Sequence, residues 1–301
     1  MIRRFTGPYS WAVLFTFLLI FSFTYVLLDT FVIQKSLTKV EDNSPKWAQS
    51  ESKTEAVVTD RSYEDDWIKI TIDTEQKYNS ILYIADIWVS DPKYLKTALA
   101  NNTYGRNIKD KTSNIAEENH AIFAINGDYY GFREEGYVLR NGEVYRETAR
   151  SDKSDEDLVI DENGDFSIIH ENQVSINTLL NDDNIWQILS FGPSLVENGQ
   201  LTVNETSEVS RAKTSNPRTA IGQISEGHYI IIVSDGRTEE SAGISLLELA
   251  QELKERGCIT AYNLDGGGSS TMYFNGKVMN HPTDGRSMKE REVSDIVYIG
   301  Y

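Results

Sequence analysis

The sequence predicts an α+β (mixed α/β) domain behind an N-terminal transmembrane helix. We expect a large mixed β-sheet with packed helices and a site at the strand-end loops. Three observations support this. Short apolar runs with strand-like alternation recur along the chain, with a few helical patterns between them. An uncharged apolar stretch lies near the N-terminus. Polar segments containing Gly or Pro repeatedly follow the apolar runs.

Composition limits the possible partners. The chain has 301 residues, 40% of them hydrophobic, which is enough for one large domain or two small ones. Its formal net charge of -17 opposes binding to nucleic acid, so no nucleic-acid partner is expected. An anionic substrate would need a local cluster of arginines. Cys258 is the single cysteine; it opens an apolar run and predicts a buried thiol, with no disulfide and no cysteine metal site.

Residues 9–30 are predicted to be a membrane anchor. The part from Trp11 to Leu28 contains no charged residue, and a stretch of this length can cross a hydrocarbon core of ~30 Å. Arg3 and Arg4 precede it. The positive-inside rule then places residues 1–8 in the cytoplasm and the C-terminal domain outside the cell.

A cleavable signal peptide is the alternative to this anchor. Such peptides have a shorter apolar core and end at a small-x-small cleavage site, which residues 27–32 lack. The sequence therefore favours an uncleaved signal-anchor, single-pass in the cell membrane. Residues 31–66 are rich in Ser, Thr, Lys, Glu and Asp and predict a polar linker. The domain is then expected over residues 67–301.

The first half of the domain shows two strand patterns, Trp67–Ile72 and Ile81–Val89. Asp91 and Pro92 form a helix-start signal, and we expect a helix from there to about Glu118. An apolar strand over Ala121–Ile125 follows.

The second half contains hairpins and one well-marked helix. Strands 158–160 and 166–169 flank a loop at 161–165 that resembles a calcium loop at its first, third and fifth positions. The loop lacks Gly at the sixth and Glu at the twelfth, so we reject an EF-hand. The remaining expected elements are a hairpin of strands 219–224 and 228–233, a helix from the capping box at Ser245 to Arg256, and strands 258–262 and 272–274.

The triglycine Gly266-Gly267-Gly268 lies between the last two of these strands. Consecutive glycines are explained if the backbone turns sharply or approaches a ligand closely. Successive N–H groups there could form an anion-binding nest, and Ser269 and Ser270 add hydroxyl donors. Asp265 supplies a carboxylate at its edge. The alternative is an ordinary Gly-rich turn with Asp265 as a local cap.

Further polar segments also lie beside predicted strands. Each contains Gly, Pro or charged side chains, and each alone is most often just a turn. Together with residues 265–268 they predict one site assembled from strand ends. These segments are residues 126–130, 191–195, 216–220, 234–237 and 290–293.

This ordered set of motifs resembles the phosphodiester glycosidase family. The matching motifs are NGDYYGF, FGPSLVENGQ, NPRTAIG, VSDGR, GISLLELAQEL, NLDGGGSSTM and REVSDIVYIG. The resemblance covers residues 121–301 and more loosely the region from Trp67. It implies hydrolysis of a sugar whose anomeric oxygen is linked to a phosphodiester. The family also occurs in bacterial envelope and exopolysaccharide proteins, so a phosphate-linked glycan is the expected partner.

Arginines suit the phosphate of such a substrate, because the planar guanidinium matches two phosphate oxygens at once. Arg218, Arg237 and Arg291 are the candidates. The alternative for Arg218 is an ion pair with a neighbouring carboxylate.

A carboxylate must also assist the sugar or activate water. Asp265 is the first choice, followed by Asp235 and Asp128. Asp128 departs from the family pattern, in which many members carry Gly, and Asp235 could belong to a type I′ turn. Asn126 is expected to bind sugar hydroxyls. The neighbouring tyrosines 129 and 130 are expected to stack on a sugar face.

No cofactor is predicted, because no HxH, HExxH or Cys–His spacing marks a zinc site. A divalent ion held by Asp carboxylates stays open. Among the histidines, His281 alone is expected near the site. The expected function is a membrane-anchored extracytoplasmic hydrolase acting on an envelope glycan or exopolysaccharide. The alternatives are a non-catalytic glycan-binding or assembly module and a phosphodiesterase that cuts the P–O bond.

Overall fold

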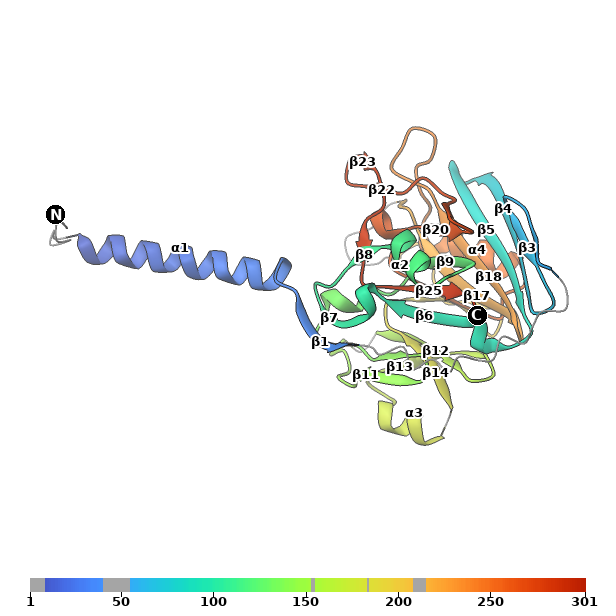
Figure 1. Cartoon of the computed structure of the whole chain (residues 1–301), viewed down its shortest axis with the longest axis horizontal. Coiled ribbons are helices and arrows are strands. Elements are labelled where there is room, and N and C mark those ends of the chain that lie inside the picture. Colours follow the sequence, from blue (N-terminus) through green and yellow to red (C-terminus); the bar gives the residue numbers. More distant parts are fainter. Residues whose placement is uncertain (1–8, 40–54, 153–154, 183, 208–214) are drawn as a thin grey trace.

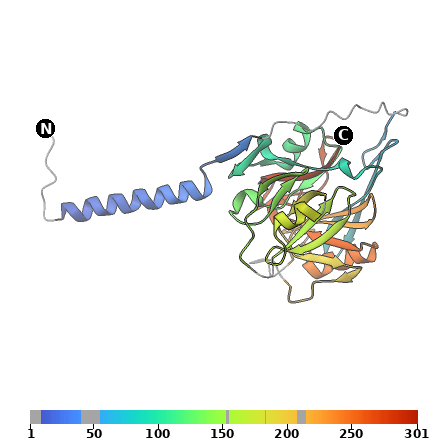
Figure 2. The same cartoon turned by 90° about the horizontal axis from the view of Figure 1, so that it is seen from below.

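The computed structural model describes residues 9–39, 55–152, 155–182, 184–207 and 215–301. A single long helix, α1 (Ser10–Phe31), projects from a layered domain. Figure 2 shows the same arrangement after a quarter turn. The strand β1 (Lys35–Lys39) joins the helix to the domain.

The largest sheet has nine strands in the order β16-β15-β19-β17-β18-β5-β4-β3-β2. Its strands are β2 (Val57–Val58), β3 (Ser62–Glu64), β4 (Ile68–Lys77), β5 (Ser80–Val89), β15 (Ser194–Glu197), β16 (Gln200–Leu201), β17 (Thr219–Ser225), β18 (His228–Ser234) and β19 (Thr260–Asn263). The strand β18 is buried along its whole length, as expected for a strand covered on both faces.

Two five-stranded sheets lie beside it. The first, ordered β21-β20-β9-β25-β6, contains β6 (Leu95–Leu99), β9 (Phe123–Asn126), β20 (Met272–Phe274), β21 (Lys277–Val278) and β25 (Asp295–Ile299). The second, ordered β11-β10-β14-β12-β13, contains β10 (Val138–Arg140), β11 (Glu143–Arg146), β12 (Glu156–Asp161), β13 (Phe166–His170) and β14 (Ile185–Leu189).

Three two-stranded pairs and the helices complete the fold. The pairs are β1 with β7 (Thr103–Arg106), β8 (Asp110–Lys111) with β24 (Glu292–Val293), and β22 (Thr283–Asp284) with β23 (Ser287–Met288). The α-helices of the domain are α2 (Thr112–Glu118), α3 (Ile176–Asp182) and α4 (Leu246–Glu255). Short 3₁₀ turns are η1 (Pro92–Tyr94), η2 (Ala100–Asn102), η3 (Tyr130–Phe132) and η4 (Gly267–Ser269).

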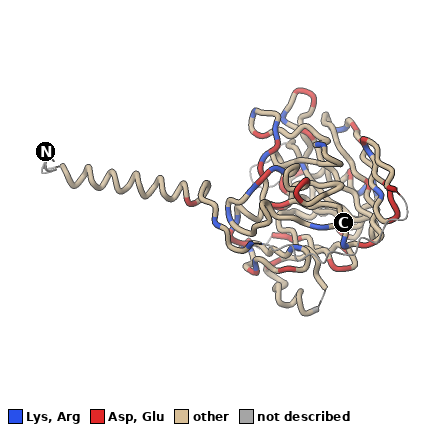
Figure 3. The backbone as a smooth tube through the Cα atoms, in the orientation of Figure 1, with Lys and Arg blue, Asp and Glu red and all other residues tan. Residues whose placement is uncertain are grey.

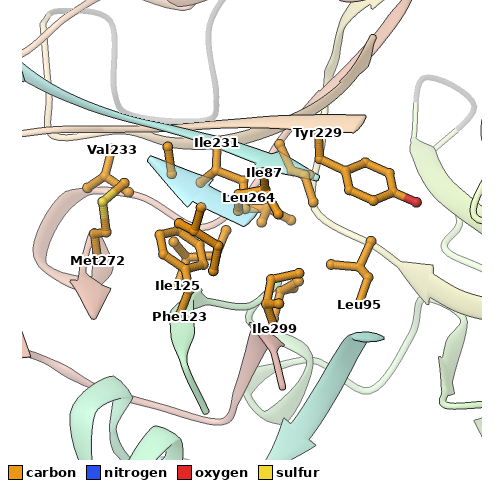
Figure 4. Packing of buried hydrophobic residues seen from close by; sticks show 14 of the residues in the cluster. Ile87, Leu95, Phe123, Ile125, Tyr229, Ile231, Val233, Leu264, Met272 and Ile299 are labelled. Carbon is orange, nitrogen blue, oxygen red and sulfur yellow. The ribbon is translucent and has the colours of Figure 1, made fainter. Parts of the chain in front are cut away.

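The main core lies between the nine-stranded sheet and the first five-stranded sheet. Fully burying each large apolar side chain there contributes about 1.5–3 kcal/mol. Figure 4 shows residues of β5 and β18 opposite residues of the facing sheet: Ile87, Tyr229, Ile231 and Val233 against Phe123, Ile125, Met272 and Ile299. A second cluster packs α4 on the outer face of the large sheet, and a third packs α2 on the outer face of the small one. The sheets are therefore enclosed between two helices.

Most strand predictions are confirmed. The expected strands at 67–72 and 81–89 are β4 and β5, and both expected hairpins form, as β12–β13 and β17–β18. The helix α4 carries the complete capping box of Ser245 and Glu248. The prediction of a mixed sheet is wrong, because every strand pair in the described residues is antiparallel, for example β5 with β18.

The predicted helix from residue 92 to about 118 is also wrong. The start signal is genuine, because the Asp91 side chain accepts from the Lys93 N–H, but it begins only the 3₁₀ turn η1. The chain then forms β6, which pairs with β25 along its whole length. The apolar residues of 95–99 are buried in this pairing, and only the last part, α2, is helical.

The segment predicted as a polar linker contains ordered strands. The residues of β1 pair with β7, and β2 and β3 extend the large sheet next to β4. The strands β1 and β3 are mostly polar and the edge strand β2 is only two exposed valines long, so composition alone resembles a tether. The sheet thus begins at Val57, before the predicted boundary at 67.

Candidate functional site

The triglycine loop connects β19 to β20 and meets the loop that follows β9. The Asp265 N–H donates to the Gly127 carbonyl at 3.3 Å. The Asn126 Nδ2 donates to the Asp265 carbonyl at 2.6 Å, and its Oδ1 accepts from the Thr219 hydroxyl at 2.8 Å. Neighbouring strand ends therefore hold Asp265 in place, as the sequence predicts for a site at strand ends.

Arginine side chains lie against two of the three glycines, and backbone lies against the first. A Cβ on Gly267, which has φ +63°, would lie 2.8 Å from a guanidinium nitrogen of Arg237. A Cβ on Gly268 would lie 2.7 Å from a guanidinium nitrogen of Arg291. One on Gly266 would meet the backbone of Pro217 and Arg218. The triglycine thus brings the predicted phosphate-binding arginines 218, 237 and 291 to one loop.

A small cleft opens beside this loop. It is lined by Gly127, Tyr129, Phe132, Asp265, Ser269, Arg291, Glu292, Val293 and Ser294. The rings of Tyr129 and Phe132 stack with centroids 4.5 Å apart and form its aromatic wall. Of the predicted site residues, the carboxylate Asp265, the cation Arg291 and the hydroxyl of Ser269 share this cleft.

The environment of Asp265 perturbs its carboxyl group. Burial raises its pKa above the usual range, although the Ser269 hydroxyl, the Arg291 charge and the Gly266 N–H all favour the charged form. The Gly266 N–H donates to its Oδ1 at 2.9 Å. A carboxyl group with a raised pKa exchanges protons nearer neutral pH than an exposed one, which suits acid–base work.

The serines after the glycines have unusual surroundings. Ser269 and Ser270 are 1% and 0% exposed, and their hydroxyls have no hydrogen-bond partner of ordinary geometry among the described residues. Buried hydroxyls of this kind are normally satisfied. Ser269 still lies close enough to Asp265 to affect its pKa.

The side chains of the three arginines differ in exposure and in hydrogen-bond partners. Arg291 donates from Nε and Nη2 to Asp284 Oδ1 at 3.0 and 2.9 Å. Arg237 is exposed and donates to Asn216 Oδ1 at 3.2 Å. Arg218 is 4% exposed, and its Nε donates to the Ile244 carbonyl at 3.3 Å. Arg237 and Arg291 can therefore turn toward an anion more readily than Arg218.

Asp235 lies on the Arg237 side of the loop, in contact with His281. Its Oδ2 is 3.0 Å from the His281 Nδ1, and its Oδ1 accepts from the His281 N–H at 2.8 Å. Tyr83 Oη lies 3.0 Å from the same ring nitrogen. The His281 side chain is 58% exposed. Asn280 links this group to the loop, because its Nδ2 donates to the Ser270 carbonyl at 3.0 Å.

Asp128 lies outside the cleft lining. It is fully buried and pairs with Arg140 at 2.9 Å, and Arg140 also pairs with Asp295 at 2.9 Å. Burial opposes its ionisation, but Arg140 and the Ser190 N–H outweigh burial and hold its pKa below the usual range. Asn126 is also fully buried, with its amide bonded inside the protein. Asn126 therefore holds the backbone of Asp265, whereas Asp128 belongs to a buried cluster with Arg140 and Asp295.

Two non-glycine residues at the site have left-handed backbone conformations. Tyr129 has φ +72° and Arg237 has φ +63°. Such conformations cost a non-glycine residue about 1–2 kcal/mol. Strain of this kind concentrates at functional sites, where surrounding contacts hold it.

Sequence reasoning did not find several residues of this region. Asp284 pairs with Arg291, Arg140 holds two carboxylates, and Phe132 completes the aromatic wall. The signals were weak: Asp284 lies in an ordinary Asp-Gly turn pattern, and Arg140 follows an apolar run. Within the described ranges, no three His, Cys, Asp or Glu side chains are grouped so as to hold a metal ion.

Residues 119–300 match a family model described as phosphodiester glycosidase, which covers more than half of the chain. The chain belongs to the phosphodiester glycosidase family.

Individual relatives of this phosphodiester glycosidase domain are more distant. N-acetylglucosamine-1-phosphodiester alpha-N-acetylglucosaminidase of Mus musculus is 34% identical over 110 residues, 33% of this chain and 21% of that protein. The SPbeta prophage-derived uncharacterized protein YomE of Bacillus subtilis is 29% identical over 203 residues, 66% of this chain and 31% of that protein. The chain therefore spans about a third or less of the length of these relatives.

Solved structures share the fold. The zebrafish N-acetylglucosamine-1-phosphodiester alpha-N-acetylglucosaminidase catalytic domain, auto-inhibited by its pro-peptide, has a TM-score of 0.62 and 20% identity, covering 89% of this chain and 88% of that one. A hypothetical protein from Synechocystis has a TM-score of 0.54 and 17% identity, covering 77% of this chain and 62% of that one.

Proposed function

We propose that this protein is a membrane-anchored extracytoplasmic hydrolase that cleaves the anomeric C–O bond of a glycosyl phosphodiester in an envelope glycan or exopolysaccharide. One observation carries the proposal: the half-buried carboxyl group of Asp265, whose pKa is raised, shares a cleft with Arg291 beside a triglycine loop on which Arg237 packs. The family membership and the printed name of the mouse relative support the reaction class.

The chemistry fits these side chains. The bond between the anomeric carbon and the phosphate oxygen breaks, and the phosphomonoester leaves with that oxygen. This leaving group is stable as an anion, so it needs charge neutralisation more than a proton. Arg237 and Arg291 supply it through their planar forks. Asp265 assists the oxocarbenium-like sugar or takes the proton of the attacking water. The aromatic wall of Tyr129 and Phe132 stacks on the sugar.

Asp235 has a supporting role in this proposal. Its carboxylate orients the His281 ring through Nδ1, which leaves Nε2 facing outward from an exposed side chain. We therefore place Asp235 behind His281, and Asp128 behind Asp265, as positioning residues.

Membrane anchoring is supported by α1, which among the described residues is the one helix long and apolar enough to cross a membrane. Its 22 residues correspond to about 33 Å, close to the hydrocarbon thickness. None of them is buried, and Asp29 is its only charged residue, at the end near the domain (Figure 3). The domain also holds the helix end, through Asn107 and the pairing of β1 with β7, which favours an uncleaved anchor over a signal peptide.

The test is hydrolysis of sugar-1-phosphodiesters in isotopically labelled water by the full chain. Label on the sugar hydroxyl supports the glycosidase. Label on the phosphate would show a phosphodiesterase that cuts the P–O bond. Binding without turnover of any compound in the panel would support the glycan-binding module instead. The Asp265→Asn variant is the control, and it should bind the same compounds without hydrolysing them.

A further inference from the structure

The domain holds the end of the anchor helix. Asn107 Nδ2 lies 3.2 Å from the Thr30 carbonyl and 3.1 Å from the Ile33 carbonyl. Carbonyl groups at a helix C-terminus lack partners within the helix, so the hydrogen bond to Thr30 caps α1 from the domain, and the bond to Ile33 holds the chain just after it. Lys35 pairs with Asp29 at 2.8 Å across the same junction.

The strand after the helix is part of the domain. It pairs antiparallel with β7, and Ser36 lies opposite Gly105. A Cβ at residue 105 would lie 2.1 Å from the Lys35 carbonyl oxygen, so glycine there allows the close approach of β1. The helix and the domain are therefore joined by backbone pairing as well as by the covalent chain.

The same junction touches the cleft. The Asn107 backbone N–H donates to the Gly131 carbonyl at 3.1 Å, and Gly131 lies within η3 beside Phe132 of the aromatic wall. The following strand, β8, pairs with β24, whose Glu292 and Val293 line the cleft. Figures 1 and 2 show α1 leaving the domain beside β7, whereas β3 and β4 lie at the far end.

We infer that the substrate is a glycosyl phosphodiester whose aglycone is a lipid of the same membrane. This inference rests on the proposed function. With α1 in the bilayer, the junction at Asp29 and Lys35 lies at the headgroup layer, and the contacts above hold the cleft next to it. A lipid-linked sugar phosphate places its phosphodiester in that layer. A site fixed there meets such a substrate at a high effective concentration.

The experiment uses the full chain reconstituted in vesicles and two substrates with the same sugar-1-phosphate. One has a long-chain lipid aglycone in the vesicle, and the other has a short, water-soluble alkyl aglycone. The undocked variant S36P/T38P/N107G removes N–H donors from β1 and the cap from α1, while its glycine accepts the φ of +58° at residue 107. The matched control, S36A/T38A, keeps the backbone donors.

The expected result is that undocking lowers kcat/KM for the lipid substrate about tenfold, because the cleft is then no longer held at the headgroup layer and its effective concentration there falls. The rate on the soluble substrate should stay within about twofold, and the control should match the wild type on both. Equal rates of wild type and undocked variant on the lipid substrate would overturn the inference. Wild-type turnover of the soluble substrate alone would overturn it and leave the proposed function standing, whereas turnover of neither would overturn both.

A position measurement checks the geometry independently. The native Cys258 is buried, so a dye can be directed to an introduced cysteine. Lys111→Cys in β8 should be quenched strongly by a headgroup quencher, and Asp73→Cys at the far end only weakly. The undocked variant should lose this difference. Equal quenching at the two positions in the docked chain would contradict the placement of the cleft at the membrane.

Discussion

Replacing Gly267 by alanine tests two properties of the triglycine loop: its left-handed backbone conformation and the room that it leaves for Arg237. This residue has φ +63°, and it has no Cβ. A Cβ added there would lie 2.8 Å from a guanidinium nitrogen of Arg237. Gly276, in the turn between β20 and β21, offers a matched control. It has φ +83°, but nothing lies within 4 Å of its Cβ position.

The backbone cost should be the same in both variants, about 1–2 kcal/mol for a left-handed alanine. The additional effect at Gly267 is steric. An ordinary contact lies at 3.4–4 Å, so the Arg237 guanidinium must move by roughly 0.6–1.2 Å. Because Arg237 is exposed, this movement costs little stability. A misplacement of ~1 Å in a positioning group costs about 10²-fold in rate, or roughly 2.7 kcal/mol of transition-state stabilisation.

The assay is kcat/KM on a soluble sugar-1-phosphodiester together with the urea midpoint of each variant. We expect equal losses of stability in Gly267→Ala and Gly276→Ala, and a loss of activity in the first alone. If Gly267→Ala keeps more than about a third of the wild-type kcat/KM, Arg237 does not hold the phosphate. A stability loss well beyond that of Gly276→Ala would mean that the arginine is a fixed structural group.

Other residues of the site give further predictions. Asp265→Asn should lower turnover by at least ~10²-fold. Burial raises the pKa of Asp265 in the folded state, so the ionised carboxylate destabilises the folded protein at pH values above the unfolded-state pKa of about 3.9. The Asn variant should therefore unfold at higher urea than wild type at pH 7, and the difference should vanish at pH 3. Arg291→Lys should lose most of its kcat/KM with little change in melting temperature, because lysine lacks the fork; near-normal activity would place the phosphate elsewhere. Tyr129→Gly should raise KM for the sugar, and an unchanged KM would remove Tyr129 from the binding wall. Relieved φ strain and lost ring packing act in opposite directions on the free energy of unfolding in this variant.

The strands and hairpins were largely predictable, because alternation and turn residues are local signals. The helix α4 was predictable for the same reason, through its capping box. The region after Pro92 was not, since the start signal there is real but the later residues are held by pairing with β25, about 200 residues along the chain. The strands β2 and β3 were hidden because they are short and lie within a mostly polar segment: β2 is only two exposed valines, and β3 is Ser-Tyr-Glu.

Within the candidate site, the motifs indicated loops that the fold brings together, but they could not show which of their side chains are buried and bonded within the protein. Asp128 and Asn126 occupy a motif that suggests chemistry, yet both are fully buried and bonded within the protein. Nothing local in the sequence shows that Arg140, on another strand, neutralises Asp128. The role of a carboxylate depends on partners that only the fold brings together.

The acidic groups at and behind the cleft differ in their ion pairs: Glu292 pairs with Lys109, and Asp128 pairs with Arg140. Arg140 serves two carboxylates, Asp128 and Asp295, and burial raises the pKa of Asp295 while Arg140 keeps Asp128 ionised. That cluster fixes the end of β9, because the Gly127 N–H donates to the Asp295 carbonyl and the Gly127 carbonyl accepts from Asp265. Asp265 itself has no arginine in an ion pair with it among the described residues. Arg291, the arginine that lines the cleft, is paired with Asp284. Burial therefore raises the pKa of Asp265 although the Arg291 charge opposes this. A phosphodiester entering the cleft would compete with Asp284 for Arg291 and leave the Asp265 carboxyl facing the sugar.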